Sequence, residues 1–93
     1  MIRSFADKEA AKIWAGTPSR RLPLVIQPVA RRKLRMLANA STLDDLKSPP
    51  ANRLEALRGN RKGQHSIRIN DQWRICFSWK DGHAHDVEVV DYH

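Results

Sequence analysis

The sequence predicts an α+β fold, in which an N-terminal strand and two helices pack on a twisted, mostly antiparallel sheet. Two observations carry this prediction. Apolar residues recur at helical spacing in the first half of the chain, whereas the second half contains short runs of strand-forming residues. These runs follow one another with short turns between them, which is typical of antiparallel pairing. The length of 93 residues predicts a single domain over residues 1–93.

The first expected elements are a short strand and a short helix. Residues 1–5 form a mixed apolar segment that suits a strand. Asp7 is a good helix N-cap, and Gly16 is a typical stop signal. Between them, Ala10, Ile13 and Trp14 follow at helical spacing, and we expect this side of the helix to enter the core.

A second helix is predicted around Pro28, which fits a first helical turn. Its other side carries arginines, which we interpret as a solvated helix face rather than an RNA contact. The apolar stripe consists of Ile26, Ala30, Leu34, Leu37 and Ala38, and the basic side of Arg31, Arg32 and Arg35.

The chain changes its period after the Pro49-Pro50 pair. Residues 53–57, RLEAL, are a candidate strand, and residues 58–63, RGNRKG, form a loop with three cations and two glycines. Three further strands are expected, at residues 64–69, 73–79 and 85–92.

The hydrophobic pattern selects the register of the hairpin HSIRINDQWRICF, residues 65–77. A three-residue loop over residues 70–72 places Ile67 opposite Ile75 and gives one almost wholly apolar face. Arg68 then lies opposite Arg74 on the other face. Like charges that face each other directly are destabilising, so either a carboxylate lies between them or the pair awaits an anion.

The composition favours an anionic partner. The chain carries 17 lysines and arginines against 10 acidic residues, a net charge of +7, which favours nucleic acid or an acidic protein. Its one cysteine excludes an internal disulfide. No apolar run is long enough to cross a bilayer, and the N-terminus lacks a signal-peptide pattern. We therefore expect a soluble cytoplasmic protein without membrane contact.

The last three residues of the chain are groups that transfer protons. Asp91, Tyr92 and His93 follow a valine-rich strand that can hold them in place. If they share a face with the arginine pair and the cationic loop, the parts suit cleavage of a phosphate ester. RNA carries its own nucleophile, the 2′-hydroxyl, so no metal or protein nucleophile is needed.

A metal site is the main rival use of the histidines. His83, His85 and His93 lie near one another in sequence, but no cysteine or second ligand pair completes a tetrahedral set. We expect no metal and no cofactor. Cys76 is most simply a small buried side chain.

Two stretches resemble a known protein family. RLEALRGNRKGQHSIRINDQWRICF, residues 53–77, and the end VEVVDYH are similar to the HigB toxins of bacterial toxin–antitoxin systems, within the RelE/ParE superfamily. The opening MIRSF and the Arg32-Lys33-Leu34 helix also fit, so the resemblance covers nearly the whole chain.

The resemblance implies a RelE-like fold and a metal-independent, ribosome-dependent endoribonuclease that cuts mRNA and inhibits translation and growth. It also implies neutralisation by a HigA-type helix-turn-helix antitoxin, through which alone the toxin reaches operator DNA. The catalytic candidates are Arg68, Arg74, Asp91, Tyr92 and His93, and the candidates for contact with RNA or phosphate are Arg58, Arg61, Lys62 and His65. Glu55 stands where some relatives carry a histidine.

Two other functions remain open at this point. One is a ParE-like protein that inhibits a DNA topoisomerase by binding it. The other is a basic RNA- or ribosome-binding module without catalysis. The arginine pair, the cationic loop and the DYH end favour the nuclease.

Overall fold

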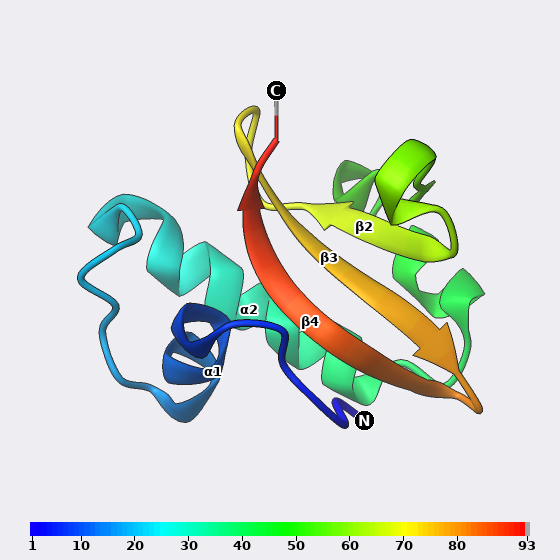
Figure 1. Ribbon diagram of the computed structural model, residues 1–93, viewed down its shortest axis with the longest axis horizontal. Helices are drawn as coiled ribbons and strands as arrows, with labels where there is room; N and C mark the ends of the chain where they lie inside the picture. Colours follow the sequence, from blue (N-terminus) through cyan, green and yellow to red (C-terminus); the bar gives the residue numbers. More distant parts are fainter. Residues whose placement is uncertain (93) are drawn as a thin grey trace.

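The computed structural model describes residues 1–92, and it confirms the α+β class (Figure 1). Strands β1 to β4 form one antiparallel sheet in the order β1-β2-β3-β4. Helix α2 runs behind this sheet in Figure 1, so the view looks onto the face opposite to α2. Within residues 1–92, no helix is long and apolar enough to span a bilayer. The elements are α1 (Lys8–Ala15), α2 (Gln27–Asn39), β1 (Glu55–Ala56), β2 (Gln64–Arg68), β3 (Trp73–Lys80), β4 (His83–Asp91) and the short 3₁₀ turns η1 (Leu24–Ile26), η2 (Leu43–Lys47), η3 (Pro50–Asn52) and η4 (Gly59–Arg61).

The N-terminal segment differs from the continuous strand that we expected. It makes two isolated parallel bridges to β4, from Ile2 to Ala84 and from Phe5 to Val87. Between these two bridges, Asp86 adopts a left-handed conformation with φ of 52°. A left-handed residue bends a strand and interrupts the regular ladder there.

The predicted caps hold helix α1 in place. The Asp7 side chain accepts a hydrogen bond from Ala10 N at 2.7 Å. Gly16, with φ of 85°, donates its N–H to Ile13 O and ends the helix. Ala10 and Ile13 are buried as expected, but Trp14 is 36% exposed, so the expectation that it enters the core is wrong.

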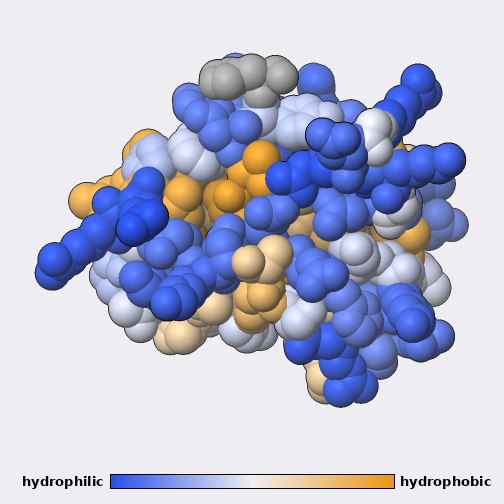
Figure 2. Space-filling model, in the orientation of Figure 1, coloured by the Kyte–Doolittle hydropathy of each residue, from blue (hydrophilic) through white to orange (hydrophobic). Residues whose placement is uncertain are grey.

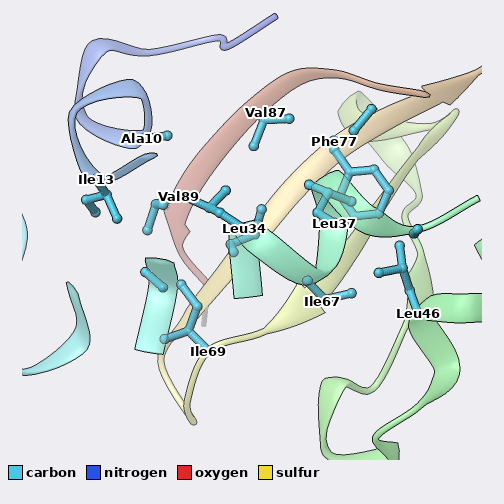
Figure 3. Packing of buried hydrophobic residues seen from close by; sticks show 14 of the residues in the cluster. Ala10, Ile13, Leu34, Leu37, Leu46, Ile67, Ile69, Phe77, Val87 and Val89 are labelled. Carbon is cyan, nitrogen blue, oxygen red and sulfur yellow. The ribbon is translucent and has the colours of Figure 1, made fainter. Parts of the chain in front are cut away.

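The core lies between the two helices and the face of the sheet that α2 covers (Figure 3). Helix α2 contributes its apolar stripe, and the strands contribute alternate residues, as the two-residue period requires. Arg31, Arg32 and Arg35 are exposed on the other side of α2. The fully buried side chains of this core include Leu34, Leu37, Ile67, Ile75, Phe77 and Val87.

The predicted hairpin register is confirmed residue by residue. Ile67 pairs with Ile75 and Arg68 pairs with Arg74. Ile69 N donates to Trp73 O at 2.9 Å, which closes the three-residue loop. Arg68 and Arg74 therefore lie on the same face of the sheet.

Candidate active site

The sheet face opposite the helices brings together four of the candidate site residues, Arg61, Arg68, Arg74 and Tyr92. Directly paired residues point to the same side of a sheet, so the register defines this face. We call it the site face. Its side chains include Glu55 on β1, Ser66 and Arg68 on β2, Arg74 and Cys76 on β3, Glu88 on β4, and Tyr92 directly after β4.

Arg74 is the central cation of the site face, and the fold orients it closely. Its side chain is 9% exposed. Nε donates to Ser66 Oγ at 2.7 Å, and Nη2 donates to the backbone oxygen of Arg53 at 2.6 Å. Nη2 also lies 3.7 Å from Glu55 Oε2. These contacts leave the guanidinium little freedom to rotate, so its charge is directed in advance toward one place.

Arg68 is the more exposed member of the pair. Its guanidinium forms a hydrogen-bonded ion pair with Asp71 in the hairpin loop. The Asp71 side chain is 99% exposed, so this partner is almost fully hydrated. Exposed ion pairs are weak, about 0–1 kcal/mol, and a phosphate that approaches Arg68 can displace Asp71.

Each arginine of the pair therefore has a carboxylate beside it. The sequence predicted either one carboxylate between the two arginines or a bound anion. The structure instead shows two carboxylates, Asp71 beside Arg68 and Glu55 beside Arg74. The Glu55 side chain is 49% exposed and the Asp71 side chain is 99% exposed. Because Glu55 and Asp71 are themselves exposed, an external anion can compete with each carboxylate for its arginine.

Arg61 adds a third cation to the site face. Its Nη1 contacts Glu88 Oε1 at 2.5 Å and Gln64 Oε1 at 3.0 Å, so the side chain reaches from η4 across the sheet. The hydrogen bond to Glu88 raises the pKa of the Arg61 guanidinium above its ordinary value.

Cys76 lies in the register between Ser66 and Glu88 and is fully buried. Burial raises the pKa of its thiol, so the thiol stays protonated near neutral pH and is a poor nucleophile. This confirms the structural interpretation of Cys76 made from the sequence.

Tyr92, which directly follows β4, lies beside Arg74. Figure 1 shows the C-terminal end of β4 beside the turn that joins β2 and β3, and Tyr92 N donates to Gln72 O at 2.6 Å. The Arg74 guanidinium lies over the Tyr92 ring, 5.6 Å from its centroid, and the Tyr92 hydroxyl lies 3.5 Å from Glu55 Oε1. A phenol, a carboxylate and a guanidinium thus converge within one site.

Glu55 is the functional candidate that sequence reasoning missed. From the sequence it was only the residue that replaces a histidine of some relatives. In the structure its two carboxylate oxygens face Tyr92 and Arg74 from the edge strand β1. Its pairing with Ser66 is the signal that identifies it, and only a register for the strand at residues 53–57 would have supplied that pairing.

Four other predicted residues do not join this cluster. Arg58 and Lys62 are exposed at the two ends of η4, beside Arg61. His65 pairs with Phe77 and stacks on its ring at 6.2 Å, so it faces the helices. Asp91 pairs with Trp73 and accepts from Gln72 Nε2 at 3.1 Å on that same side. His93 lies outside the described residues.

No cluster of three or more His, Cys, Asp or Glu residues among residues 1–92 is arranged to hold a metal ion. His83 instead lies beside Arg3, with Nε2 and Nη2 3.3 Å apart. Burial and the Arg3 charge lower the pKa of His83.

The site face is suited to binding an anion next to groups that can accept and donate protons. Figure 2 shows that hydrophilic residues cover most of the surface over β2 and β3. Arg74 supplies a positive charge that is held in place, Arg68 and Arg61 add two further cations, and Glu55 and Tyr92 can act as proton acceptor and proton donor. Such a set is appropriate for a phosphodiester whose nucleophile comes with the substrate.

Comparisons with known proteins agree with this chemistry and this fold. The chain is 42% identical over 85 residues to Toxin HigB-1 of Vibrio cholerae, covering 90% of each chain. It is 27% identical over 93 residues to Endoribonuclease HigB of Proteus vulgaris, covering 100% of both. The fold resembles a chain of the YoeB–YefM complex from Staphylococcus aureus, with a TM-score of 0.62 at 16% identity over 100% of this chain and 98% of that one.

A protein-family model agrees with the resemblance that the sequence carries. Residues 3–93 match the model described as the RelE-like toxin of the type II toxin–antitoxin system HigB. With this match, the fold and the relative from Vibrio cholerae in agreement, the chain belongs to the HigB-like toxins of type II toxin–antitoxin systems.

Proposed function

We propose that this HigB-like toxin is a ribosome-dependent endoribonuclease that cleaves mRNA and thereby stops translation. The observation that carries the proposal is the convergence of Arg74, Glu55 and Tyr92 on the site face, with Arg68 and Arg61 beside them. A relative that spans the whole chain bears the name Endoribonuclease HigB, which supports the same activity.

Arg74 and Arg68 bind the scissile phosphate in this proposal. Arg74 is held by Ser66 and the Arg53 carbonyl, so it can donate to a phosphate oxygen without first losing entropy. Arg68 releases the exposed Asp71 and adds a second charge as the phosphate gains negative charge in the transition state. Arg58, Arg61 and Lys62 lie along the adjoining turn and guide the flanking RNA backbone.

The RNA 2′-hydroxyl is the nucleophile. Its oxygen attacks the phosphorus while its proton passes to the Glu55 carboxylate. The bond from phosphorus to the 5′-oxygen breaks as that oxygen takes a proton from the end of the chain, from Tyr92 or His93. The products are a 2′,3′-cyclic phosphate and a 5′-hydroxyl. Where Tyr92 is the donor, the 3.5 Å contact with Glu55 provides the route by which the proton returns.

The partner that restrains the toxin is an antitoxin, and we propose that it is of the HigA helix-turn-helix type. The toxin reaches operator DNA only through that protein. A net charge of +7 favours an acidic stretch of antitoxin against part of the basic surface. A dissociation constant that does not change between low and high salt would count against this charge-based contact.

The test of the nuclease is mRNA cleavage on programmed ribosomes, mapped by primer extension. Wild-type toxin is expected to cut mRNA bound to the ribosome and to leave the same mRNA intact when ribosomes are omitted. The matched control is Arg20→Ala, which removes an exposed arginine from the loop before η1 and should cut normally. Intact mRNA on programmed ribosomes, together with loss of DNA supercoiling after induction, would assign the toxicity to a topoisomerase instead.

A further inference from the structure

A buried lysine and a buried asparagine lie directly behind the segment that orients Arg74. Lys33 on α2 is 8% exposed, and its ammonium donates to Asn52 Oδ1. Asn52 is 0% exposed and donates its amide to Leu46 O at 3.2 Å and to Ser48 O at 3.4 Å. The two side chains thus tie α2 to the turns η2 and η3.

The residue after Asn52 is the one whose carbonyl holds Arg74. Arg53 has φ of 45° and ψ of 56°, a left-handed conformation that is uncommon for a residue with a side chain. This conformation directs Arg53 O toward Arg74 Nη2 at 2.6 Å. Asn52, the residue before it, is fixed through both its side chain and its backbone N–H, and the Arg53 N–H itself donates to Pro50 O at 3.0 Å.

Burying a lysine here is costly on structural grounds alone. Burial lowers the pKa of Lys33, and the nearby charges of Arg32 and Arg68 lower it further. An apolar side chain of similar size would often be neutral or better for stability at such a position. The position therefore calls for a reason beyond packing.

We propose that Lys33 and Asn52 are positioning residues for the reaction, which act by locking the Arg53 carbonyl that aims the Arg74 guanidinium at the scissile phosphate. The chain of contacts runs from Lys33 through Asn52 and the Arg53 backbone to Arg74. Neither Lys33 nor Asn52 touches the substrate. This inference rests on the proposed nuclease function for its effect on rate, but the effect on Arg74 itself is independent of that function.

The first test observes Arg74 directly. In Lys33→Met, the Arg74 Nε–Hε resonance in ¹⁵N NMR spectra is expected to shift and its hydrogen to exchange faster with solvent. Arg61 provides the internal control, because Glu88 and Gln64 hold it without involving Asn52. Lys12→Met, a matched change on the exposed side of α1, should leave both resonances unchanged. An unchanged Arg74 resonance in folded Lys33→Met would overturn the proposal.

The second test uses single-turnover cleavage on programmed ribosomes at saturating toxin. Lys33→Met is expected to lower the rate constant about 10- to 100-fold, because small misplacements of a catalytic group are costly. The toxin concentration for half-saturation should stay the same, because no RNA contact is lost. Asn52→Leu should behave in the same way. Asn52→Asp keeps the acceptor for Lys33 and should recover part of the rate.

A double-mutant cycle separates positioning from a general effect on the fold. In an Arg74→Lys background the planar guanidinium that Arg53 O aims is already gone, so adding Lys33→Met should change the rate less than about twofold. Independent effects that multiply would overturn the proposal. If Arg74→Lys cleaves as fast as wild type, the assigned role of Arg74 fails, and the NMR result still decides whether Lys33 orients it.

Discussion

Arg68 and Arg74 face each other directly across β2 and β3, yet the fold treats them differently. Arg74 is almost buried and bonded to Ser66 and the Arg53 carbonyl, whereas Arg68 is three times more exposed and paired with a loop carboxylate. One cation of the pair is thus fixed and the other is free to adjust. Such a division suits a site that must both orient a phosphate and follow its change of charge.

The difference between the two arginines leads to a prediction about single substitutions. Arg68→Ala and Arg74→Ala should each reduce mRNA cleavage by about 10²–10³-fold, because each removes a charge donor to the phosphate. Arg68→Ala should change the free energy of unfolding by less than about 0.5 kcal/mol. Arg74→Ala should lower it by about 1–3 kcal/mol, because it leaves the Arg53 carbonyl without its donor.

Urea denaturation and single-turnover cleavage on the same protein samples check both halves of this prediction. Arg35→Ala serves as the control, since Arg35 is an exposed arginine of α2. If either site variant remained as active as wild type, that arginine would have a structural role only.

Glu55→Gln tests the proton acceptor. Glutamine keeps the size of the side chain and an oxygen for Tyr92, but it cannot take a proton from the 2′-hydroxyl. The cleavage rate at saturation should fall about 10²–10⁴-fold, the usual contribution of a general base. The affinity for ribosomes should not weaken, because the change removes a negative charge beside Arg74.

Glu55→His is the companion variant, because it replaces the carboxylate with another group that can accept a proton. Its imidazole titrates near neutral pH and is a suitable base, so this variant should retain much more activity than Glu55→Gln. A Glu55→Gln protein that cleaves at the wild-type rate would show that Glu55 serves only as a partner of Arg74.

A prediction about pH concerns the junction of α1 with the loop that follows it. Ser19 Oγ donates to Glu9 Oε1 at 2.5 Å, and Lys12 lies 3.6 Å from Glu9 Oε2. The hydrogen bond from Ser19, and then the charge of Lys12, lower the pKa of Glu9 below its ordinary value of 4.5. A carboxyl with a lowered pKa in the folded state stabilises the fold above its unfolded pKa, and this stabilisation is lost as the pH falls through the folded value.

Wild type should therefore be more stable than Glu9→Gln at pH 7, and the difference should shrink toward pH 3. Urea midpoints at the two pH values measure this change. Asp44→Asn is the control, because Asp44 forms an exposed pair with Lys47 and should matter little at either pH. A difference between wild type and Glu9→Gln that grows on acidification would contradict the assignment.

The parts of this fold that the sequence predicted are those set by local pattern. Asp7 and Gly16 cap α1, and the apolar alternation around Ile67 and Ile75 selects one hairpin register, because a slip by one residue would bury Arg68. The site could be predicted as far as this register extends. It covers Arg68 and Arg74, whereas the approach of Tyr92 depends on the pairing of β3 with β4, for which the sequence predicted no register.

What the sequence could not supply depends on contacts between distant segments. Glu55 enters the site because a strand of two residues pairs with Ser66, and so short a strand has no readable period. His65 looks like a site residue by its neighbours in sequence, but strand alternation turns it toward Phe77. Asp86 interrupts the N-terminal pairing through a backbone conformation that no local pattern announces.

The two candidates for the general acid are Tyr92 and His93. General chemistry slightly favours His93, because an imidazole titrates near neutral pH. The structure gives a reason to prefer Tyr92. Its ring lies against the Arg74 guanidinium and its hydroxyl lies 3.5 Å from Glu55, so the phenol is beside both the phosphate-binding cation and the proton acceptor.

The expected result is a large loss of mRNA cleavage in Tyr92→Phe and a small one in the chain truncated after Tyr92. Phenylalanine keeps the ring against Arg74 and removes only the proton, so a rate lowered about 10²–10⁴-fold at unchanged stability would identify the phenol as the acid. The truncation places a new carboxylate at residue 92, so amidation of the truncated chain controls for that charge. A large loss in the amidated truncation with full activity in Tyr92→Phe would return the acid to His93. Full activity in both variants would leave the arginines and Glu55 as the whole catalytic apparatus.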